Sequence, residues 1–309
     1  MTGLVRAEVI RFTSRRLFRY IAVLAVAGIA ASAVIAFVQS SNDPDAGLEA
    51  ARLQVADCEG FKQSVRPEQK SEIDCPSVEA LAAQFDKRFR YTEAMPDATR
   101  GVSVAFFILS FVVAASFMGA EWGSGSMTTL LTWEPRRGRV LVAKVIAAAG
   151  LLALAAALLL ALLDVVFIPV ASLRGTTAGL TGSVWWTLAG IWLRGAALAT
   201  FAAFVACAIS TITRNTAGAI GVAFGYGVII DPLLGTIRSG RFRPWLLQHL
   251  LPRLLGLPVE VPQPEFAEPG VVPTIQTTLT AVRPVVVLSI YAAAVLALAY
   301  AAFRARDVT

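Results

Sequence analysis

Residues 119–144 read GAEWGSGSMTTLLTWEPRRGRVLVAK, a polar and glycine-rich stretch that lies between two long apolar runs. Each of these runs is long enough to cross about 30 Å of hydrocarbon as a helix, which takes about 20 residues. A polar connector between two spanning helices lies outside the bilayer, where water or a partner can satisfy its polar groups. This stretch therefore decides both the fold class and the topology that the sequence predicts.

The composition of the whole chain is that of a membrane protein. Hydrophobic residues make up 56% of the 309 residues and charged residues only 16%, whereas a soluble domain carries about 25% charged residues. The chain is expected to be an all-α membrane protein with six transmembrane helices. The expected spans are Tyr20–Val38, Val102–Gly119, Val140–Val170, Val184–Ser210, Ala217–Leu234 and Pro284–Phe303.

The distribution of arginine predicts the orientation. Arginines gather in the leader 1–19, in the connector 119–144 and after the sixth span, so the positive-inside rule places both termini in the cytoplasm. The large loop after the fifth span is also basic, but charges far from helix ends count less. The net charge of +6 is interpreted as this bias, with anionic lipids as the counter-charge and no nucleic-acid partner. The dominance of arginine over lysine suggests a bacterial plasma membrane.

We expect one transmembrane domain, residues 1–309, with two larger external segments. The leader is either an interfacial amphipathic helix or a plain arginine stop signal. The first external segment, 39–99, is expected to be helical, and its Cys58 and Cys75 either form a disulfide in an oxidising exterior or remain thiols. The second, 235–283, contains Pro244–Leu257, which is too short to span the bilayer and is expected to be a re-entrant or interfacial helix.

The chemistry-bearing residues do not form a catalytic pattern. The sequence has no Gly-x-x-x-x-Gly-Lys-Ser/Thr motif for ATP phosphates. It has a single histidine, His249, and no cluster of thiols, so it predicts no metal site and no enzyme activity. Asp164 and Arg194 fall within predicted spans, where charged groups are costly; either they pair or face a cavity, or each is satisfied locally. The small residues Gly218, Gly221 and Gly225 predict a helix-packing face.

The connector resembles the corresponding segment in the membrane subunits of ABC-2 type ABC transporters. Those permeases typically carry G-x-E-x-x-x-G-[ST]-x-x-x-L-L-[ST]-x-P-x-x-R-x-x-x-x-x-K between their second and third helices. Pro135 lies one position off this pattern, and Trp133–Glu134 replaces a more usual small or apolar pair. The matching residues are Gly119, Glu121, Gly125, Ser126, Leu130, Leu131, Thr132 and Arg137, and Lys144 lies one position beyond the lysine of the pattern. The leader, the six helices, a Ser210–Arg214 stretch and the external hairpin extend the resemblance over nearly the whole chain.

This resemblance implies an ABC-2 (type V exporter-like) permease with a cytoplasmic coupling helix after the second span and an external re-entrant hairpin before the sixth. Two permease halves, as a homodimer or a related heterodimer, would each bind a separate ATPase subunit that holds ATP and Mg²⁺. No cofactor is expected in this chain itself. The residues implied in ATPase coupling are Glu121, Gly123, Gly125, Met127, Leu130, Leu131, Arg136, Arg137 and Arg139.

The function implied by the resemblance is export of an apolar or amphipathic substrate, driven by ATP hydrolysis on the partner. The alternative is a membrane anchor or sensor whose external loop 39–99 binds a ligand without transport.

Overall fold

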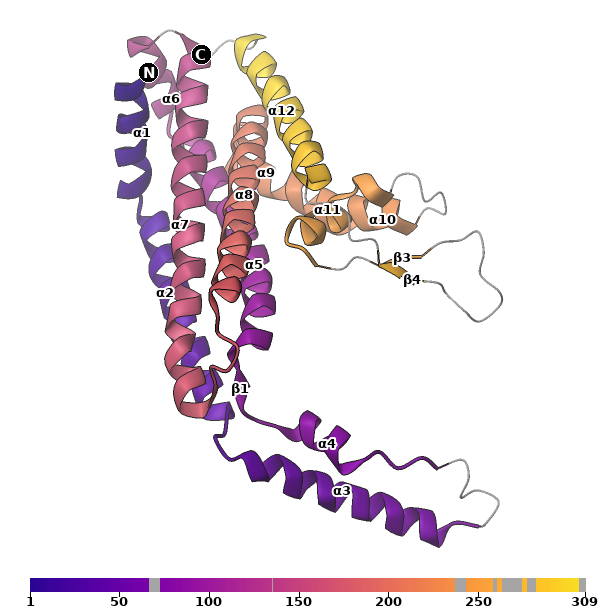
Figure 1. Cartoon of the computed structure of the whole chain (residues 1–309). Coiled ribbons are helices and arrows are strands. Elements are labelled where there is room, and N and C mark those ends of the chain that lie inside the picture. Colours follow the sequence, from indigo (N-terminus) through magenta and orange to yellow (C-terminus); the bar gives the residue numbers. More distant parts are fainter. Residues whose placement is uncertain are drawn as a thin grey trace. The chain divides into compact units, whose positions relative to one another are not determined.

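The computed structural model describes residues 1–66, 73–134, 136–236, 243–257, 260–262, 274–276 and 282–305, and most of them are helical (Figure 1). Within these residues six helical stretches are long and apolar enough to cross a membrane, which confirms the expected number. The chain is thus a multi-pass membrane protein. The six stretches are α2 (Arg16–Gln39), α5 (Tyr91–Gly123), α7 (Arg137–Arg174), α8 (Gly182–Thr213), Thr216–Thr236 and α12 (Val282–Ala305).

Several spans extend well beyond the expected bounds. Helix α5 begins at Tyr91 rather than Val102 and includes Pro96 near its start. Hydropathy marks only the part of a helix that fits the hydrocarbon, whereas the hydrogen-bonded helix continues into polar sequence outside it. The apolar runs therefore predicted where each helix lies but not where it ends.

The fifth span is not a uniform α-helix. It consists of α9 (Thr216–Phe224), a π-helical stretch (η2, Gly225–Ile230) and α10 (Asp231–Thr236). Asn215 caps the start of α9 by accepting a hydrogen bond from the backbone N–H of Ala217 at 2.8 Å. The π-helical stretch ends just before Pro232, whose ring nitrogen carries no hydrogen for the helical ladder.

The chain divides into two compact units. Unit 1 comprises residues 1–25, 98–161 and 187–309, and unit 2 comprises residues 26–97 and 162–186. The core of unit 1 is rich in small side chains, so its helices pack closely. At Gly119 of α5, an added Cβ would lie 2.5 Å from the backbone nitrogen of Thr216 at the start of α9.

The leader is helical but does not continue straight into the first span. Helix α1 (Thr2–Ser14) ends at Arg15, whose backbone is extended (φ −68°, ψ 132°), and α2 starts at the next residue. Glu8 and Phe12 are the buried residues of α1, while Ile10 is 59% exposed. The face of this helix that packs against the protein thus combines the charged Glu8 with the apolar Phe12, and Ile10 lies on the outer face.

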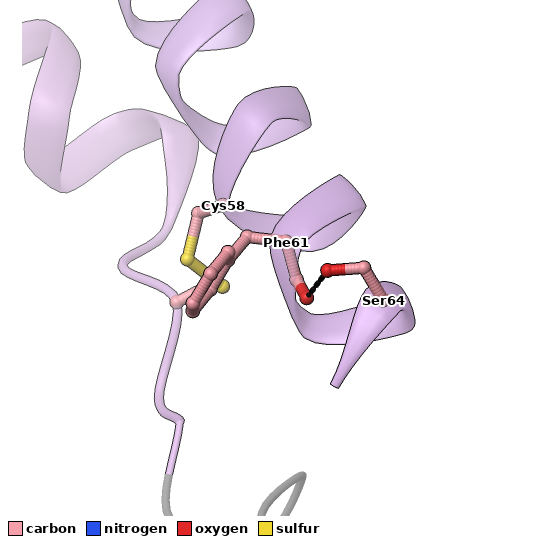
Figure 2. Close-up of a disulfide and its surroundings, with 4 residues drawn as sticks. Cys58, Phe61 and Ser64 are labelled. Atoms are coloured by element: carbon pink, nitrogen blue, oxygen red, sulfur yellow. Dashed lines mark hydrogen bonds between the residues drawn. A yellow bond between two sulfur atoms is a disulfide. The ribbon is translucent and has the colours of Figure 1, made fainter. Parts of the chain in front are cut away.

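Unit 2 contains a helical hairpin, α3 (Pro44–Ser64) and α4 (Val78–Phe85). The sequence places these two helices near Ala46–Ala56 and Ser77–Arg90; α3 is longer than expected at both ends, and α4 is shorter and ends at Phe85. The predicted disulfide is confirmed: Cys58 and Cys75 are bonded across the hairpin with their Cα atoms 6.0 Å apart. Figure 2 shows this bond beside Phe61, whose carbonyl oxygen accepts a hydrogen bond from the Ser64 hydroxyl at 2.7 Å.

The hairpin ends in a charged turn. Asp86 accepts hydrogen bonds from the guanidinium groups of Arg88 and Arg90, at 2.8 Å and 3.0 Å to the same carboxylate oxygen. The bond from Arg88 holds the pKa of the Asp86 carboxyl well below its usual range. Two residues of strand β1 (Phe89–Arg90) then pair in parallel with β2 (Gly175–Thr176), also in unit 2.

The segment 235–283, which is expected to be external, is only partly described. Helix α11 (Leu247–Leu254) follows a 3₁₀ turn, η3 (Arg243–Trp245), and packs between α8 and α12 of unit 1. The sequence predicts that Pro252 interrupts the segment Pro244–Leu257, but Pro252 lies inside the last turn of α11, which continues to Leu254. Short antiparallel strands β3 (Glu260–Pro262) and β4 (Thr274–Gln276) follow. About half of 235–283 lies outside the described residues, and the re-entrant hairpin stays a prediction.

Candidate functional site

Five charged side chains meet where the leader lies against the two ends of the connector. Glu8 comes from α1, Glu121 from the end of α5 and Lys144 from the first turns of α7. The Lys144 Nζ lies 2.7 Å from an oxygen of Glu8 and 2.5 Å from an oxygen of Glu121. Arg11 and Arg15 each contact one of the carboxylates, at 2.8 Å and 3.0 Å. We call these five residues the charge cluster.

The inner part of the charge cluster is removed from water. The side chain of Lys144 is fully buried, that of Glu8 is 1% exposed and that of Glu121 is 4% exposed. These three groups carry one formal positive charge between two negative charges. Arg11 and Arg15 are partly exposed and supply the remaining positive charge from the rim. These ion pairs offset the cost of burying the charges, although the Glu121 Oε2 that contacts Lys144 accepts no hydrogen bond of regular geometry from the described residues.

Aromatic rings enclose the cluster on its apolar side. The Phe117 ring centroid lies 4.9 Å from the guanidinium carbon of Arg15 and 5.1 Å from the Lys144 Nζ. Both distances suit a cation–π contact. Phe12 packs edge-on against Phe117 with their centroids 4.8 Å apart. Because the chain bends at Arg15, the Arg15 side chain can both contact Glu121 and stack on the Phe117 ring.

The connector between α5 and α7 forms one short helix, α6 (Ser126–Trp133). Gly125 precedes it with φ +68°, a left-handed conformation that glycine adopts without steric cost. Met127 is buried in the core of unit 1, and Leu130 and Leu131 pack partly against it. Figure 1 shows α1, α6 and the start of α7 lying together.

The structure separates the coupling residues expected from the sequence into three groups. Glu121 and Met127 are buried, with Leu130 and Leu131 half-buried, so these four attach the connector to the helices. Arg137 and Arg139 are half-buried. Three residues are exposed: Gly123, Gly125 and Arg136.

Further contacts attach the connector to other helices of unit 1. The guanidinium of Arg137 donates a hydrogen bond to the backbone carbonyl of Phe303, near the end of α12, at 3.2 Å. A Cβ added at Gly138 would lie 2.9 Å from the ring of Tyr300 on the same helix. The Arg214 guanidinium lies 4.9 Å from the Trp122 ring centroid. The connector is thereby fixed to α5, α7 and α12 together.

The other residues singled out in the sequence have different outcomes. Asp164 belongs to unit 2, where its backbone carbonyl accepts a hydrogen bond from the Tyr91 hydroxyl, and Arg194 belongs to unit 1, so their pairing stays a prediction. A Cβ added at Gly221 or Gly225 would meet nothing within 4 Å. Among the described residues, that face of the fifth span is open. A Cβ added at Gly218 would lie 3.1 Å from the Cβ of Thr213.

The sequence analysis missed Glu8, Arg15 and Trp133. Glu8 is the only acidic residue of the leader, and its position on one helical arc with Arg11 was the available signal. Trp133 at the end of α6 is 85% exposed, an unusual exposure for tryptophan beside a polar connector. Among the residues that the structure describes, no group of three or more His, Cys, Asp or Glu could hold a metal ion.

Comparison of the chain with protein-family models and with curated proteins found no match. The functional argument therefore depends on the connector and on its contacts.

Proposed function

We propose that the chain is the permease subunit of an ATP-driven ABC-2 type exporter, with ATP hydrolysis on a separate subunit and an apolar or amphipathic substrate. The observation that carries the proposal is the rigid attachment of α6. A short helix that is to receive force from a partner must be fixed to the spans that the force moves. The charge cluster and the buried Met127 supply such a fixation.

The mechanism follows from the two ends of the connector. Glu121 ends one span and Lys144 starts the next, and their ion pair at 2.5 Å holds these spans together. A displacement of α6 would therefore move α5 and α7 as one body, and the contact between Glu8 and Lys144 would carry the leader along. Packed elements transmit displacement in this way because interiors are dense and poorly compressible.

The surface that remains for a partner is small and mostly uncharged. Thr129, Thr132 and Trp133 of α6 are exposed, together with Gly123 and Arg136 on either side. A large exposed aromatic side chain next to small polar residues is typical of an interface anchor. We assign this face of α6 to the ATPase subunit. The open face at Gly221 and Gly225 is assigned to the second permease half.

The test is reconstitution with a cytosolic P-loop ATPase from the same source, measured by co-purification and by ATP-dependent export from vesicles. Trp133→Ala is expected to reduce both, whereas Trp186→Ala, at a tryptophan that is 80% exposed in unit 2, should reduce neither. Loss of a hot-spot tryptophan typically weakens an interface by about 2 kcal/mol or more. If Trp133→Ala associates and transports normally, α6 is not the docking helix.

The rival function is a membrane anchor or sensor. The disulfide-bonded hairpin of unit 2 is the feature that favours it, because a rigid external element suits ligand binding. A chain that binds no ATPase and moves no substrate, but whose hairpin retains a ligand, would establish this reading instead.

A further inference from the structure

Three arginines of unit 1 come together at the last turn of α11. Arg253 lies on that turn. The Nε of Arg100 donates a hydrogen bond to the Leu255 carbonyl at 3.2 Å. Arg194 reaches the same turn from α8, because a Cβ added at Gly256 would lie 2.8 Å from its Nη1.

Gly256 makes the approach of Arg194 possible in two ways. Its φ of +77° ends the helix in a left-handed conformation, which favours glycine. Its lack of a side chain leaves the space that the Arg194 guanidinium occupies. The fold thus brings a guanidinium from a membrane-spanning helix close to the end of a short external one.

Arg253 is the unusual member of the group. Its side chain is 7% exposed, and its Nε and Nη1 have no hydrogen-bond partner among the described residues. Burial lowers the pKa of its guanidinium, and the nearby charge of Arg283 lowers it further. A buried guanidinium with unmade hydrogen bonds is strongly unfavourable unless an anion completes it.

The buried carboxylate close to α11 lies at the other end of the helix from Arg253. Asp231 is buried close to α11, but its carboxylate accepts the backbone N–H groups of Leu247 and Gln248 at the opposite end of the helix. That end lies about 8 Å from Arg253 along the helix axis. The Arg283 guanidinium stacks on the Trp245 ring at 5.4 Å. The C-terminus of a helix contributes only about half a negative charge.

We propose that Arg253, Arg194 and Arg283 form a binding site for a phosphate-type anionic group at the end of α11. A guanidinium offers paired N–H donors that match the oxygens of a phosphate, and burial strengthens such charge-assisted hydrogen bonds. The anion is either the headgroup phosphate of a lipid at the membrane surface or free phosphate. The site is independent of the ATPase subunit proposed above.

The experiment measures thermal stability of the full-length protein in a non-ionic detergent. The probes are dihexanoyl phosphatidylglycerol, dihexanoyl phosphatidylcholine and sodium phosphate, each compared with sodium chloride at equal ionic strength. A ligand that binds the folded state raises Tm by mass action, so the titration yields an apparent Kd. Stabilisation by either lipid but not by free phosphate identifies a headgroup, and stabilisation by free phosphate identifies a soluble anion.

Arg253→Met is expected to weaken this binding at least about tenfold, which is the scale of one charge-assisted hydrogen bond. Without ligand the same variant should be at least as stable as the wild type, because it removes a buried and incompletely bonded charge. Arg283→Gln, with a partly exposed side chain, should also weaken binding. Arg304→Met, an exposed arginine on the same helix as Arg283, is the matched control and should bind normally.

Two results would overturn the site. One is a wild-type protein that none of the three probes stabilises beyond chloride. The other is an Arg253→Met variant that binds like the wild type, or that is less stable without ligand, since an arginine completed by its own chain would behave in that way.

Discussion

Replacing Lys144 by methionine tests the charge cluster most directly. The substitution keeps a long apolar stem and removes the only positive charge between Glu8 and Glu121. Both carboxylates contact the same Nζ, at 2.7 Å and 2.5 Å, so these two oxygens lie at most the sum of those distances, about 5.2 Å, apart. At an effective dielectric constant of about 20, two negative charges at that separation repel by about 3 kcal/mol.

The expected loss of stability for Lys144→Met is about 3–5 kcal/mol, which is the usual result of removing one partner from a buried ion pair. A second substitution, Glu8→Gln, should restore part of the lost stability. In the double variant no carboxylates repel each other, and Glu121 keeps its contact with Arg15 at 3.0 Å. We expect the double variant to recover about 2–3 kcal/mol, the size of the repulsion removed.

The measurement is equilibrium unfolding of the purified protein in mixed micelles, combined into a double-mutant cycle. Trypsin cleavage after Arg11 or Arg15 provides a second reading, because a released leader exposes both sites. Lys87→Met is the control, since Lys87 is exposed and belongs to unit 2. If Lys144→Met unfolds like this control, or if Glu8→Gln adds to the damage instead of relieving it, the cluster does not hold the leader.

Three further predictions concern packing, acid and the disulfide. Gly119→Ala should destabilise unit 1 by about 1–3 kcal/mol through overpacking against α9, as measured by thermal unfolding, whereas Gly123→Ala meets nothing within 4 Å and should be neutral. The pKa of the Asp86 carboxyl is depressed in the folded hairpin, so its stabilisation is complete above the unfolded value of about 3.9. The difference in Tm between the wild type and Asp86→Asn should therefore shrink as the pH falls below about 4. Joint replacement of Cys58 and Cys75 by serine should cost the hairpin about 3 kcal/mol, and proteolysis within unit 2 should speed up accordingly.

The sequence predicted the spans well because a long apolar run has few other stable environments. It could not predict where the helices end. Tyr91–Gly123 continues far outside its apolar run, and the π-helical stretch at Gly225–Ile230 has no hydropathy signal. The bend at Arg15 was also hidden, because arginine is compatible with a continuous helix. Such features depend on tertiary contacts that a local pattern does not contain.

Only the part of the candidate site that lies in the connector could be predicted from the sequence. Glu121 was singled out from the connector, but as a residue expected to face a partner. Its burial depends on Glu8 and Lys144, which are 136 residues apart in the chain. Arg194 was found as a charge at membrane depth, yet its proximity to Gly256 follows from the turn that ends α11. Pairwise contacts between distant segments are the information that a single sequence lacks.

The contact between α1 and the two ends of the connector is made by charged rather than apolar side chains, and this has a physical consequence. Apolar side chains of similar volume would often stabilise such a position as well as a buried ion pair does. They would also tolerate several positions of one helix against another, because dispersion contacts have little directionality. The charge cluster does not tolerate several positions. A shift of α1 by one turn would move Glu8 about 5.4 Å, which is twice its distance from Lys144. The cluster therefore specifies one position of the leader relative to both ends of the connector, as a segment that transmits displacement requires.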